Sequence, residues 1–384
     1  MRILFSSLPT HGHTYPLLPL AAAARKAGHE VVYATGADFH PVLTALDLEP
    51  VAAGMPISEA FAIASKAAGV TDPRKEGPEA QERVIAGVFG SALPRRFLAD
   101  LRDVVTPGSF DLVVHEAGNP GAGLAARRAG IPGLCHGFGR VVSAGLGDRI
   151  AGSLGELAAE IGETVPDRYA NILGNPYLDI YPPSLQGPDF RATGDRVELR
   201  PVPFAEPGQL PEVVGERDRP LVYLTLGTAF GTADVLSTAI EGLSGLDVRV
   251  LVSGGRLVEA AALGQLPENV TAVSWLPQAD LLPHLDLIVH HGGSGTTLGA
   301  LGAGVKQLLT PQGADQFNNA EAVVDGGAAL SLQPGELSPE AIADGARKLL
   351  EGSEFDAPVR ALAQEVAAMP SPEEIAARLP EFAG

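Results

Sequence analysis

The chain has 384 residues, 45% of them hydrophobic, so it is long enough for two domains that each bury a core. Its 46 acidic and 27 basic residues give a formal net charge of −19, which argues against nucleic acid or an anionic membrane surface as a partner. The single cysteine, Cys135, excludes internal disulfides and cysteine-rich metal sites and is consistent with a reducing cytoplasm.

The first half of the chain alternates between short apolar strands and alanine-rich helices. Strands are expected at residues 1–6, 30–34, 111–115 and 131–135, and helices at 15–27 and 123–129. This order is typical of an open parallel sheet. The apolar start is short and breaks at Pro9, so we expect no secretory signal, and no window is long and uncharged enough to span a bilayer.

Prolines and charges crowd together between about residues 180 and 220, and we interpret this stretch as a linker. The pattern then restarts, with strands expected at 221–226, 248–252, 270–273 and 287–290, and helices at 234–243, 341–350 and 359–368. The expected division is a first domain over 1–205, a linker over 206–219, a second domain over 220–365 and a helical tail over 366–384 that returns to the first domain. The predicted fold class is α/β, with two Rossmann-like doubly wound domains that bind ligands in a cleft at the carboxyl ends of their strands.

A glycine-rich segment, HHGGSGTT, follows the last of these strands from His290 to Thr297. Glycines allow the main chain to approach a ligand closely, and a helix beginning near Ser294 would present free N–H groups and a partial positive charge. His291 can donate a hydrogen bond to the same ligand. The segment therefore predicts an anion site, most naturally for phosphate. The alternative is a tightly packed strand-to-helix turn that binds nothing.

Three named motifs come close to matching the sequence. Residues 299–306 place the lysine of a P-loop one position too late, and no Ser or Thr follows it. Residues 292–296 lack the last glycine of a nucleophile elbow. Residues 121–126 match the loose dinucleotide fingerprint, although Asn119 and Pro120 separate them from the preceding strand, so NAD binding stays an alternative.

Several segments together resemble family 1 glycosyltransferases, which use nucleotide sugars and have the GT-B fold. WLPQ from Trp275, HGGSGTT from His291 and PQGADQFNNA from Pro311 are similar to that family's donor-binding segment, and GHTYP from Gly12 to its acceptor-side loop. DIYPPSLQ from Asp179 is similar to a segment of actinobacterial enzymes that glycosylate polyketide, enediyne and macrolide natural products. The resemblance covers nearly the whole chain and implies an acceptor-binding first domain and a donor-binding second domain.

The resemblance implies roles for the residues of the donor segment. The pyrophosphate would be held by His291, Gly293, Ser294, Gly295 and Thr296, with a further contact from Gly227 and Thr228; the base by Trp275 and Gln278; and the sugar hydroxyls by Asp315 and Gln316. Three alternatives stay open. Trp275 could be a core residue, Asp315 and Gln316 could cap the helix that follows, and Thr228 could cap a turn.

For catalysis the resemblance implies inverting transfer, in which a general base deprotonates the acceptor hydroxyl. The candidate base is His13, at a helix N-terminus that disfavours the imidazolium form, and His11 is its rival. Family members orient this histidine with a carboxylate, usually aspartate, after a later strand, and Glu116 stands at that point here. Glu116 could instead be an exposed carboxylate at a strand end, and His13 a loop histidine without a catalytic role.

The donor segment departs from the plant form of the family, because Ser294, Gly295 and Gly299 replace a tryptophan, an asparagine and a glutamate. The resemblance links this glycine-rich form to deoxysugars carried on TDP, while a UDP-sugar remains an alternative. No metal or cofactor is implied.

Acceptor readout is assigned to glycine-containing apolar segments of the first domain, and to Phe61, Phe89 and Phe138 within them, which would also suit ordinary helix packing. The acceptor would be a hydrophobic polyketide or aromatic aglycone. We interpret the chain as an inverting glycosyltransferase; a catalytically silent GT-B partner protein and a sugar-nucleotide epimerase are the alternatives. The sequence leaves a homodimer open.

Overall fold

The computed structural model describes residues 1–384 except 73–74, 142–144, 217, 228–232, 255–263 and 314. This part of the chain forms two compact units. The first unit contains Met1–Ile180, Gly187–Leu199 and Pro370–Gly384, and the second contains Tyr181–Gln186 and Arg200–Met369.

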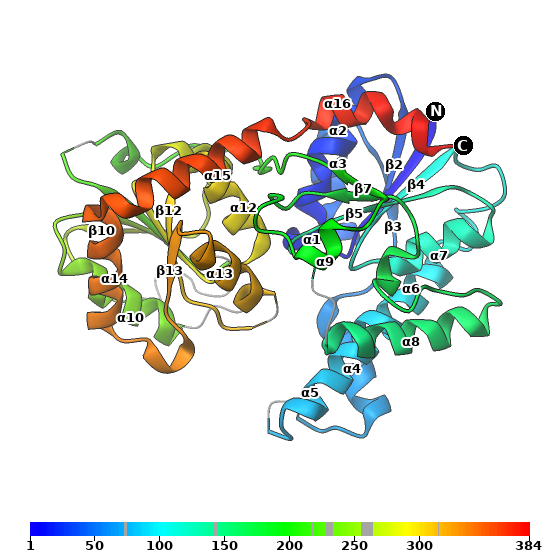
Figure 1. The fold of residues 1–384 in the computed structure, drawn as a ribbon, viewed down its shortest axis with the longest axis horizontal. Coiled ribbons are helices and arrows are strands. Elements are labelled where there is room, and N and C mark those ends of the chain that lie inside the picture. Colours follow the sequence, from blue (N-terminus) through cyan, green and yellow to red (C-terminus); the bar gives the residue numbers. More distant parts are fainter. Residues whose placement is uncertain (73–74, 142–144, 217, 228–232, 255–263, 314) are drawn as a thin grey trace. The chain divides into compact units, whose positions relative to one another are not determined.

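The first unit is built on a parallel sheet in the order β3-β2-β1-β4-β5-β6-β7 (Figure 1). Its strands are β1 (Arg2–Ser6), β2 (Glu30–Thr35), β3 (Glu49–Ala52), β4 (Leu112–Glu116), β5 (Gly133–His136), β6 (Tyr177–Asp179) and β7 (Arg196–Glu198). The central strands are continuous apolar runs because helices cover both faces of such a sheet. Phe5 of β1 pairs with Tyr33 of β2 and Val114 of β4, so the carboxyl ends of β1 and β4 lie side by side.

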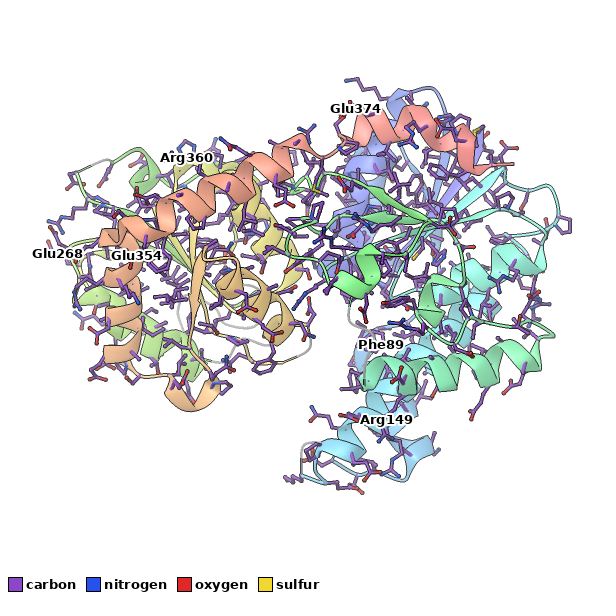
Figure 2. The ribbon with its side chains drawn as sticks, viewed as in Figure 1. Phe89, Arg149, Glu268, Glu354, Arg360 and Glu374 are labelled. Carbon is purple, nitrogen blue, oxygen red and sulfur yellow. The ribbon has the colours of Figure 1, made fainter. Side chains whose placement is uncertain are left out.

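Helices surround this sheet. They are α1 (His11–Thr14), α2 (Leu18–Lys26), α3 (His40–Ala45), α4 (Ile57–Ala68), α5 (Pro78–Gly87), α6 (Leu93–Asp100), α7 (Pro120–Arg128), α8 (Leu146–Glu160), α9 (Pro188–Arg191) and α16 (Pro372–Arg378), with a π-helical turn over Val88–Ala92. The ion pair between Arg149 of α8 and Glu82 of α5 ties two of them together (Figure 2). The chain's last α-helix, α16, packs against α2 (Figure 1).

The second unit is built on a parallel sheet in the order β10-β9-β8-β11-β12-β13. Its strands are β8 (Leu221–Thr225), β9 (Arg249–Ser253), β10 (Val270–Val273), β11 (Leu287–His290), β12 (Lys306–Leu309) and β13 (Ala329–Ser331). Its helices include α10 (Ala233–Ser244), α11 (Gln278–Leu281), α12 (Ser294–Ala303), α13 (Gln316–Asp325), α14 (Pro339–Glu351) and α15 (Asp356–Ala368). Both sheets have the doubly wound topology that the sequence predicts.

Helix starts near the carboxyl terminus of the chain follow the expected capping chemistry. Ser338 caps α14 by accepting from the N–H of Ala341, and Pro339 occupies the first helical position. Ser371 and Glu374 form a capping box at the start of α16 (Figure 2). No helix in the described ranges is long and apolar enough to cross a membrane.

The proline-rich stretch expected to be a linker contains regular structure. Helix α9 and strand β7 lie inside it, and β7 is the last strand of the first sheet. Residues after Leu199 belong to the second unit, where Val214 is buried in a core cluster. Prolines mark turns between short elements here, so their density alone did not identify a linker.

The dinucleotide-like match at residues 121–126 lies within α7, which begins at Pro120 rather than at 123. A methyl group on Gly121 would lie 2.5 Å from the carbonyl oxygen of Pro94, and one on Gly123 would collide with the ring of His115. These glycines therefore permit close helix packing. The fingerprint requires them in a phosphate-binding turn, and the structure does not place them there.

Candidate active site

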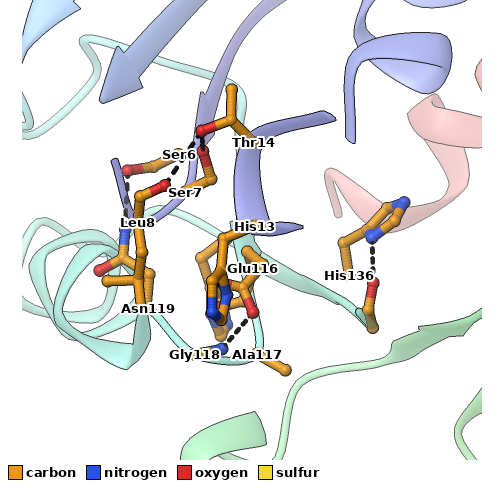
Figure 3. Close-up of polar contacts among 12 residues, drawn as sticks. Ser6, Ser7, Leu8, His13, Thr14, Glu116, Ala117, Gly118, Asn119 and His136 are labelled. Carbon is orange, nitrogen blue, oxygen red and sulfur yellow. Dashed lines mark hydrogen bonds and ion pairs between the residues drawn. The ribbon is translucent and has the colours of Figure 1, made fainter. Parts of the chain in front are cut away.

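Two polar side chains meet where β1 and β4 end in the first unit. His13 lies in α1, just after β1, and Glu116 is the last residue of β4. His13 Nδ1 is 3.0 Å from Glu116 Oε2 (Figure 3). Glu116 is fully buried, whereas 16% of the His13 side chain is exposed. A ligand can therefore contact the histidine but not the carboxylate.

The carboxylate of Glu116 is fixed by the turn that follows it. The backbone N–H of Gly118 donates to Oε1 at 2.5 Å, which leaves Oε2 for the histidine (Figure 3). Asn119 donates from Nδ2 to Ser6 Oγ at 2.9 Å and so joins this turn to β1. The negative charge favours a proton on Nδ1 of His13 and stabilises the charged ring, so Nε2 is the nitrogen that can accept a proton.

Buried hydroxyl groups hold the loop that carries His13. Ser7 Oγ lies 3.0 Å from Thr14 Oγ1, and Thr14 Oγ1 donates to the carbonyl of Leu8 at 3.0 Å (Figure 3). Tyr33 Oη lies 3.1 Å from Ser7 Oγ and 3.2 Å from the carbonyl of Thr14, and donates to them. Burial raises the pKa of Tyr33, so its hydroxyl keeps its proton and remains a donor.

The aromatic groups near this loop have different surroundings. His11, the rival base, packs edge-on against Tyr15 and Phe39, with ring centroids 4.9 and 5.1 Å away. Phe138, an expected acceptor-binding residue, lies 4.8 Å from the ring of His13. Glu116 contacts His13 and is not the exposed strand-end carboxylate of the alternative interpretation.

Phe61 and Phe89 (Phe89 is labelled in Figure 2), the other expected acceptor residues, are partly buried and pack against the core of the first unit. This packing is compatible with the alternative of ordinary helix packing, and acceptor binding by both residues stays a prediction. His115 and His136, which the sequence analysis did not single out, are fully buried on β4 and β5. Burial lowers the pKa of each to about 4, so both rings are neutral near pH 7.

In the second unit, His291 follows β11 and lies between two glycines. A methyl group on either Gly227 or Gly293 would overlap its ring, and Gly227 also has a left-handed φ of +70°. Burial lowers the pKa of His291 to about 4, against the opposing effects of the Asp315 charge and a backbone hydrogen bond with Thr225. His291 is therefore neutral near pH 7 and held in one place.

Helix α12 begins at Ser294, as the sequence predicts, with Gly293 at its N-cap. The first backbone N–H groups of a helix have no intrahelical acceptor, and the helix dipole makes this end positive. A methyl group on the exposed Gly295 would meet no atom within 4 Å, so the backbone here is open to a ligand. Gln278 Nε2 donates to Thr296 Oγ1 at 3.3 Å and links α11 to the same turn.

The side chains of Asp315 and Gln316 do not act as the alternative interpretation of a helix cap requires. Asp315 stands at the N-cap position of α13, but its side chain makes no capping hydrogen bond. It accepts instead from Ser294 Oγ at 2.6 Å and Asn319 Nδ2 at 3.0 Å. Gln316 Oε1 accepts from the backbone N–H groups at 312 and 313, at 2.7 and 3.1 Å, and closes the loop before the helix.

Trp275 is a surface residue, with 52% of it exposed. Its ring lies against Gly208, where a methyl group would be 2.6 Å from a ring carbon. The interpretation of Trp275 as a core residue is therefore wrong, and an aromatic surface is available to a ligand. Thr228, expected to contact phosphate or to cap a turn, lies outside the described residues.

Comparison with known proteins identifies the family. Residues 238–382 match the family described as erythromycin biosynthesis protein CIII-like, C-terminal domain. The chain is 33% identical to elloramycin glycosyltransferase ElmGT of Streptomyces olivaceus and 35% identical to the L-demethylnoviosyl transferase of Streptomyces niveus. These alignments cover 99% and 98% of this chain and 97% of each relative. The chain belongs to this family of glycosyltransferases.

A solved structure supports the same assignment for the fold. The glycosyltransferase VinC, crystallised in complex with DTDP, is 27% identical to this chain. The match has a TM-score of 0.77 and covers 100% of this chain and 99% of VinC. The two parallel sheets of the present glycosyltransferase are those of the GT-B fold.

Sequence reasoning missed two features of this glycosyltransferase. Gly118 has no side chain that would separate His13 from Glu116, and Asn319 donates to Asp315. The available signal for Gly118 was its place two residues after a strand-end carboxylate. Among the described residues, no group of three histidine, cysteine, aspartate or glutamate side chains is arranged to hold a metal ion.

Replacing Gly118 with alanine should lower kcat while leaving donor binding unchanged. The added methyl group would lie 3.0 Å from both oxygens of Glu116 and 3.1 Å from Cε1 of His13, so these groups must shift. We expect a loss of about tenfold, because proton transfer depends steeply on such positioning. Steady-state kinetics at saturating donor tests this expectation, and an unchanged kcat would show that the pair tolerates the displacement.

Proposed function

We propose that this glycosyltransferase is an inverting enzyme that transfers a deoxysugar from a TDP-sugar to a hydroxyl group of a hydrophobic, polyketide-type aglycone, with His13 as the general base. The observation that carries the proposal is the 3.0 Å separation between the partly exposed His13 and the fully buried Glu116. The name of the elloramycin glycosyltransferase and the DTDP bound to VinC support the classes of acceptor and donor.

In this mechanism, His13 Nε2 takes the proton of the acceptor hydroxyl as the oxygen attacks the anomeric carbon. The bond from that carbon to the diphosphate oxygen breaks on the opposite face, so the anomeric configuration inverts. Glu116 stabilises the imidazolium that forms, since its charge lies against Nδ1 and cannot be screened by water.

The departing diphosphate needs positive potential and hydrogen-bond donors. The start of α12 supplies both through its free N–H groups and the helix dipole, and Gly293 and Gly295 keep that backbone accessible. His291, fixed between Gly227 and Gly293, would contact the diphosphate beside this helix start. Because these groups stabilise the leaving group, the proposed mechanism assigns no role to a metal ion or other cofactor.

The remaining donor contacts follow from the exposed groups of the second unit. The ring of Trp275 would stack on the pyrimidine, with Gln278 beside it, because more than half of the tryptophan is open to a ligand. Asp315 and Gln316 would contact the sugar. In the first unit, Phe138 beside His13 would contact the hydrophobic acceptor, while Phe61 and Phe89 would shape its site from the core side.

Replacing His291 with alanine should weaken TDP binding about tenfold, the size expected for one lost hydrogen bond to a charged group. Calorimetric titration measures this directly. His284→Ala, on the 3-10 helix Leu282–His284 of the same unit, is the matched control and should bind TDP normally. An unchanged affinity in His291→Ala would contradict its contact with the diphosphate.

The reaction itself is tested by product analysis. The enzyme is incubated with TDP-sugars and a panel of hydroxylated polyketide aglycones, and products are identified by mass spectrometry and by NMR of the anomeric centre. We expect a glycoside with inverted configuration. A glycoside with retained configuration would contradict inverting transfer, and an altered nucleotide sugar formed without acceptor would favour an epimerase.

A further inference from the structure

A closed group of hydrogen bonds surrounds one oxygen of Asp315. Ser294 Oγ donates to Oδ2 at 2.6 Å, and Asn319 Nδ2 lies 3.0 Å from the same oxygen. Asn319 Nδ2 also lies 3.0 Å from Ser294 Oγ, so each of the three side chains contacts the other two. Ser294 is 6% exposed and Asn319 is fully buried, which protects these bonds from water.

The group is also tied to the backbone of the glycine-rich turn. Asn319 Nδ2 donates to the carbonyl of Gly292 at 2.9 Å, and Gly292 has a left-handed φ of +86°. A side chain at this position would be strained, so the turn depends on glycine. The carboxylate of Asp315 is therefore fixed relative to the start of α12 by its contacts with Ser294 and Asn319.

These contacts divide the two oxygens of Asp315 between different tasks. A carboxylate oxygen has two lone pairs. Ser294 Oγ donates to Oδ2, and Asn319 Nδ2, whose two N–H groups are shared among Gly292, Ser294 and Asp315, lies 3.0 Å from the same oxygen. Within the described ranges, no residue donates to Oδ1. Since Asp315 is only partly buried, Oδ1 is the oxygen that can meet a ligand.

The two polar atoms of the Gln316 side chain also differ in their contacts. Its Oε1 accepts from two backbone N–H groups of the preceding loop, at 2.7 and 3.1 Å. Its Nε2 donates to no residue in the part of the chain that the structure describes. Together Asp315 and Gln316 offer a ligand one carboxylate acceptor and one amide donor.

We infer that Ser294 and Asn319 are positioning residues that hold Asp315 so that Oδ1 alone accepts a hydroxyl of the transferred sugar. The inference rests on the proposed function, in which Asp315 contacts the sugar. It gives the Ser294 side chain a role toward the sugar, in addition to the role of the Ser294 backbone at the diphosphate. The site would then bind one sugar hydroxyl through Oδ1 of Asp315 and one sugar oxygen through the amide N–H of Gln316. Two such contacts suit a donor sugar with few hydroxyl groups.

The experiment compares the affinities of TDP, TDP-glucose and TDP-rhamnose by calorimetry in the full-length enzyme and its variants. In Ser294→Ala, the dissociation constant of the tighter-binding TDP-sugar should rise about tenfold, while that of TDP changes less than about twofold, because only the sugar contact to the charged group is lost. Ser294→Thr, which keeps the hydroxyl, should restore sugar binding. Ser244→Ala, at the end of α10, is the matched control and should behave as wild type.

Asn319→Ala provides a second variant that removes the other donor to Oδ2. It should show the same selective loss of TDP-sugar affinity, with a lower melting temperature because the bond to Gly292 is also lost.

Three outcomes would overturn the inference. Equal weakening of TDP and TDP-sugar in Ser294→Ala would place its hydroxyl on the diphosphate, and unchanged affinities for both would show that Asp315 needs no such support. A wild-type enzyme that binds neither TDP nor a TDP-sugar would overturn the proposed function as well, and this result is distinct from the other two.

Discussion

Replacing His13 with alanine is expected to lower kcat about a thousandfold, within the range for loss of a general base. The acceptor hydroxyl must lose its proton as it attacks, and the partly exposed His13 lies against the buried carboxylate of Glu116. In the proposed mechanism His13 acts on the acceptor hydroxyl and does not contact TDP, so the affinity for TDP should not change. Steady-state kinetics and a calorimetric titration of the same preparation measure the two quantities.

His11→Ala is the matched control for this variant, because His11 is in the same short helix and packs against Tyr15 and Phe39. It should lose stability through the lost aromatic contacts but retain most of its kcat. If instead His11→Ala were the inactive variant and His13→Ala retained its rate, the roles of the two histidines would be reversed.

Replacing Glu116 with glutamine should lower kcat about a hundredfold, because the variant keeps the shape of the side chain and loses only its charge. The imidazolium that forms during transfer would then face a neutral amide in a buried site. Steady-state kinetics at saturating donor and acceptor measures the loss.

Glu116→Asp is the conservative control for this second variant. It keeps the charge but shortens the side chain by one methylene, so the 3.0 Å contact with His13 should lengthen and kcat should fall by less than in the glutamine variant. Melting curves establish that both variants fold. An unchanged rate in Glu116→Gln would show that the buried carboxylate serves folding alone.

The positions of the strand ends could be predicted from the sequence. The apolar runs before His13, Glu116 and His291 end where β1, β4 and β11 end or within one residue of those ends, because a buried parallel strand must be apolar throughout. The sequence also predicted that α12 begins near Ser294, because glycine and small polar residues replace the apolar run there.

The contacts between distant residues could not be derived in this way. The pairing of β1 with β4 brings His13 and Glu116 together across a separation of about a hundred residues, and local pattern does not show which strands are neighbours. For the same reason, the sequence predicted a role for Ser294 from its place at a helix start. It did not show that the Ser294 hydroxyl donates to Asp315, which follows the next strand. The contact between the Trp275 ring and Gly208 likewise joins residues that are distant in the sequence.

The central claim is that His13 removes the proton of the acceptor hydroxyl, and one measurement tests it most directly. The values of kcat/KM for wild type and His13→Ala are compared with two similar aromatic acceptors, one carrying a neutral hydroxyl and one a nitro-substituted phenol that is already ionised at the assay pH. A base is needed only for the first acceptor. We predict a large loss of rate in His13→Ala with the neutral hydroxyl and almost none with the ionised phenol, whereas an equal loss with both acceptors would contradict the assignment of His13 as the base.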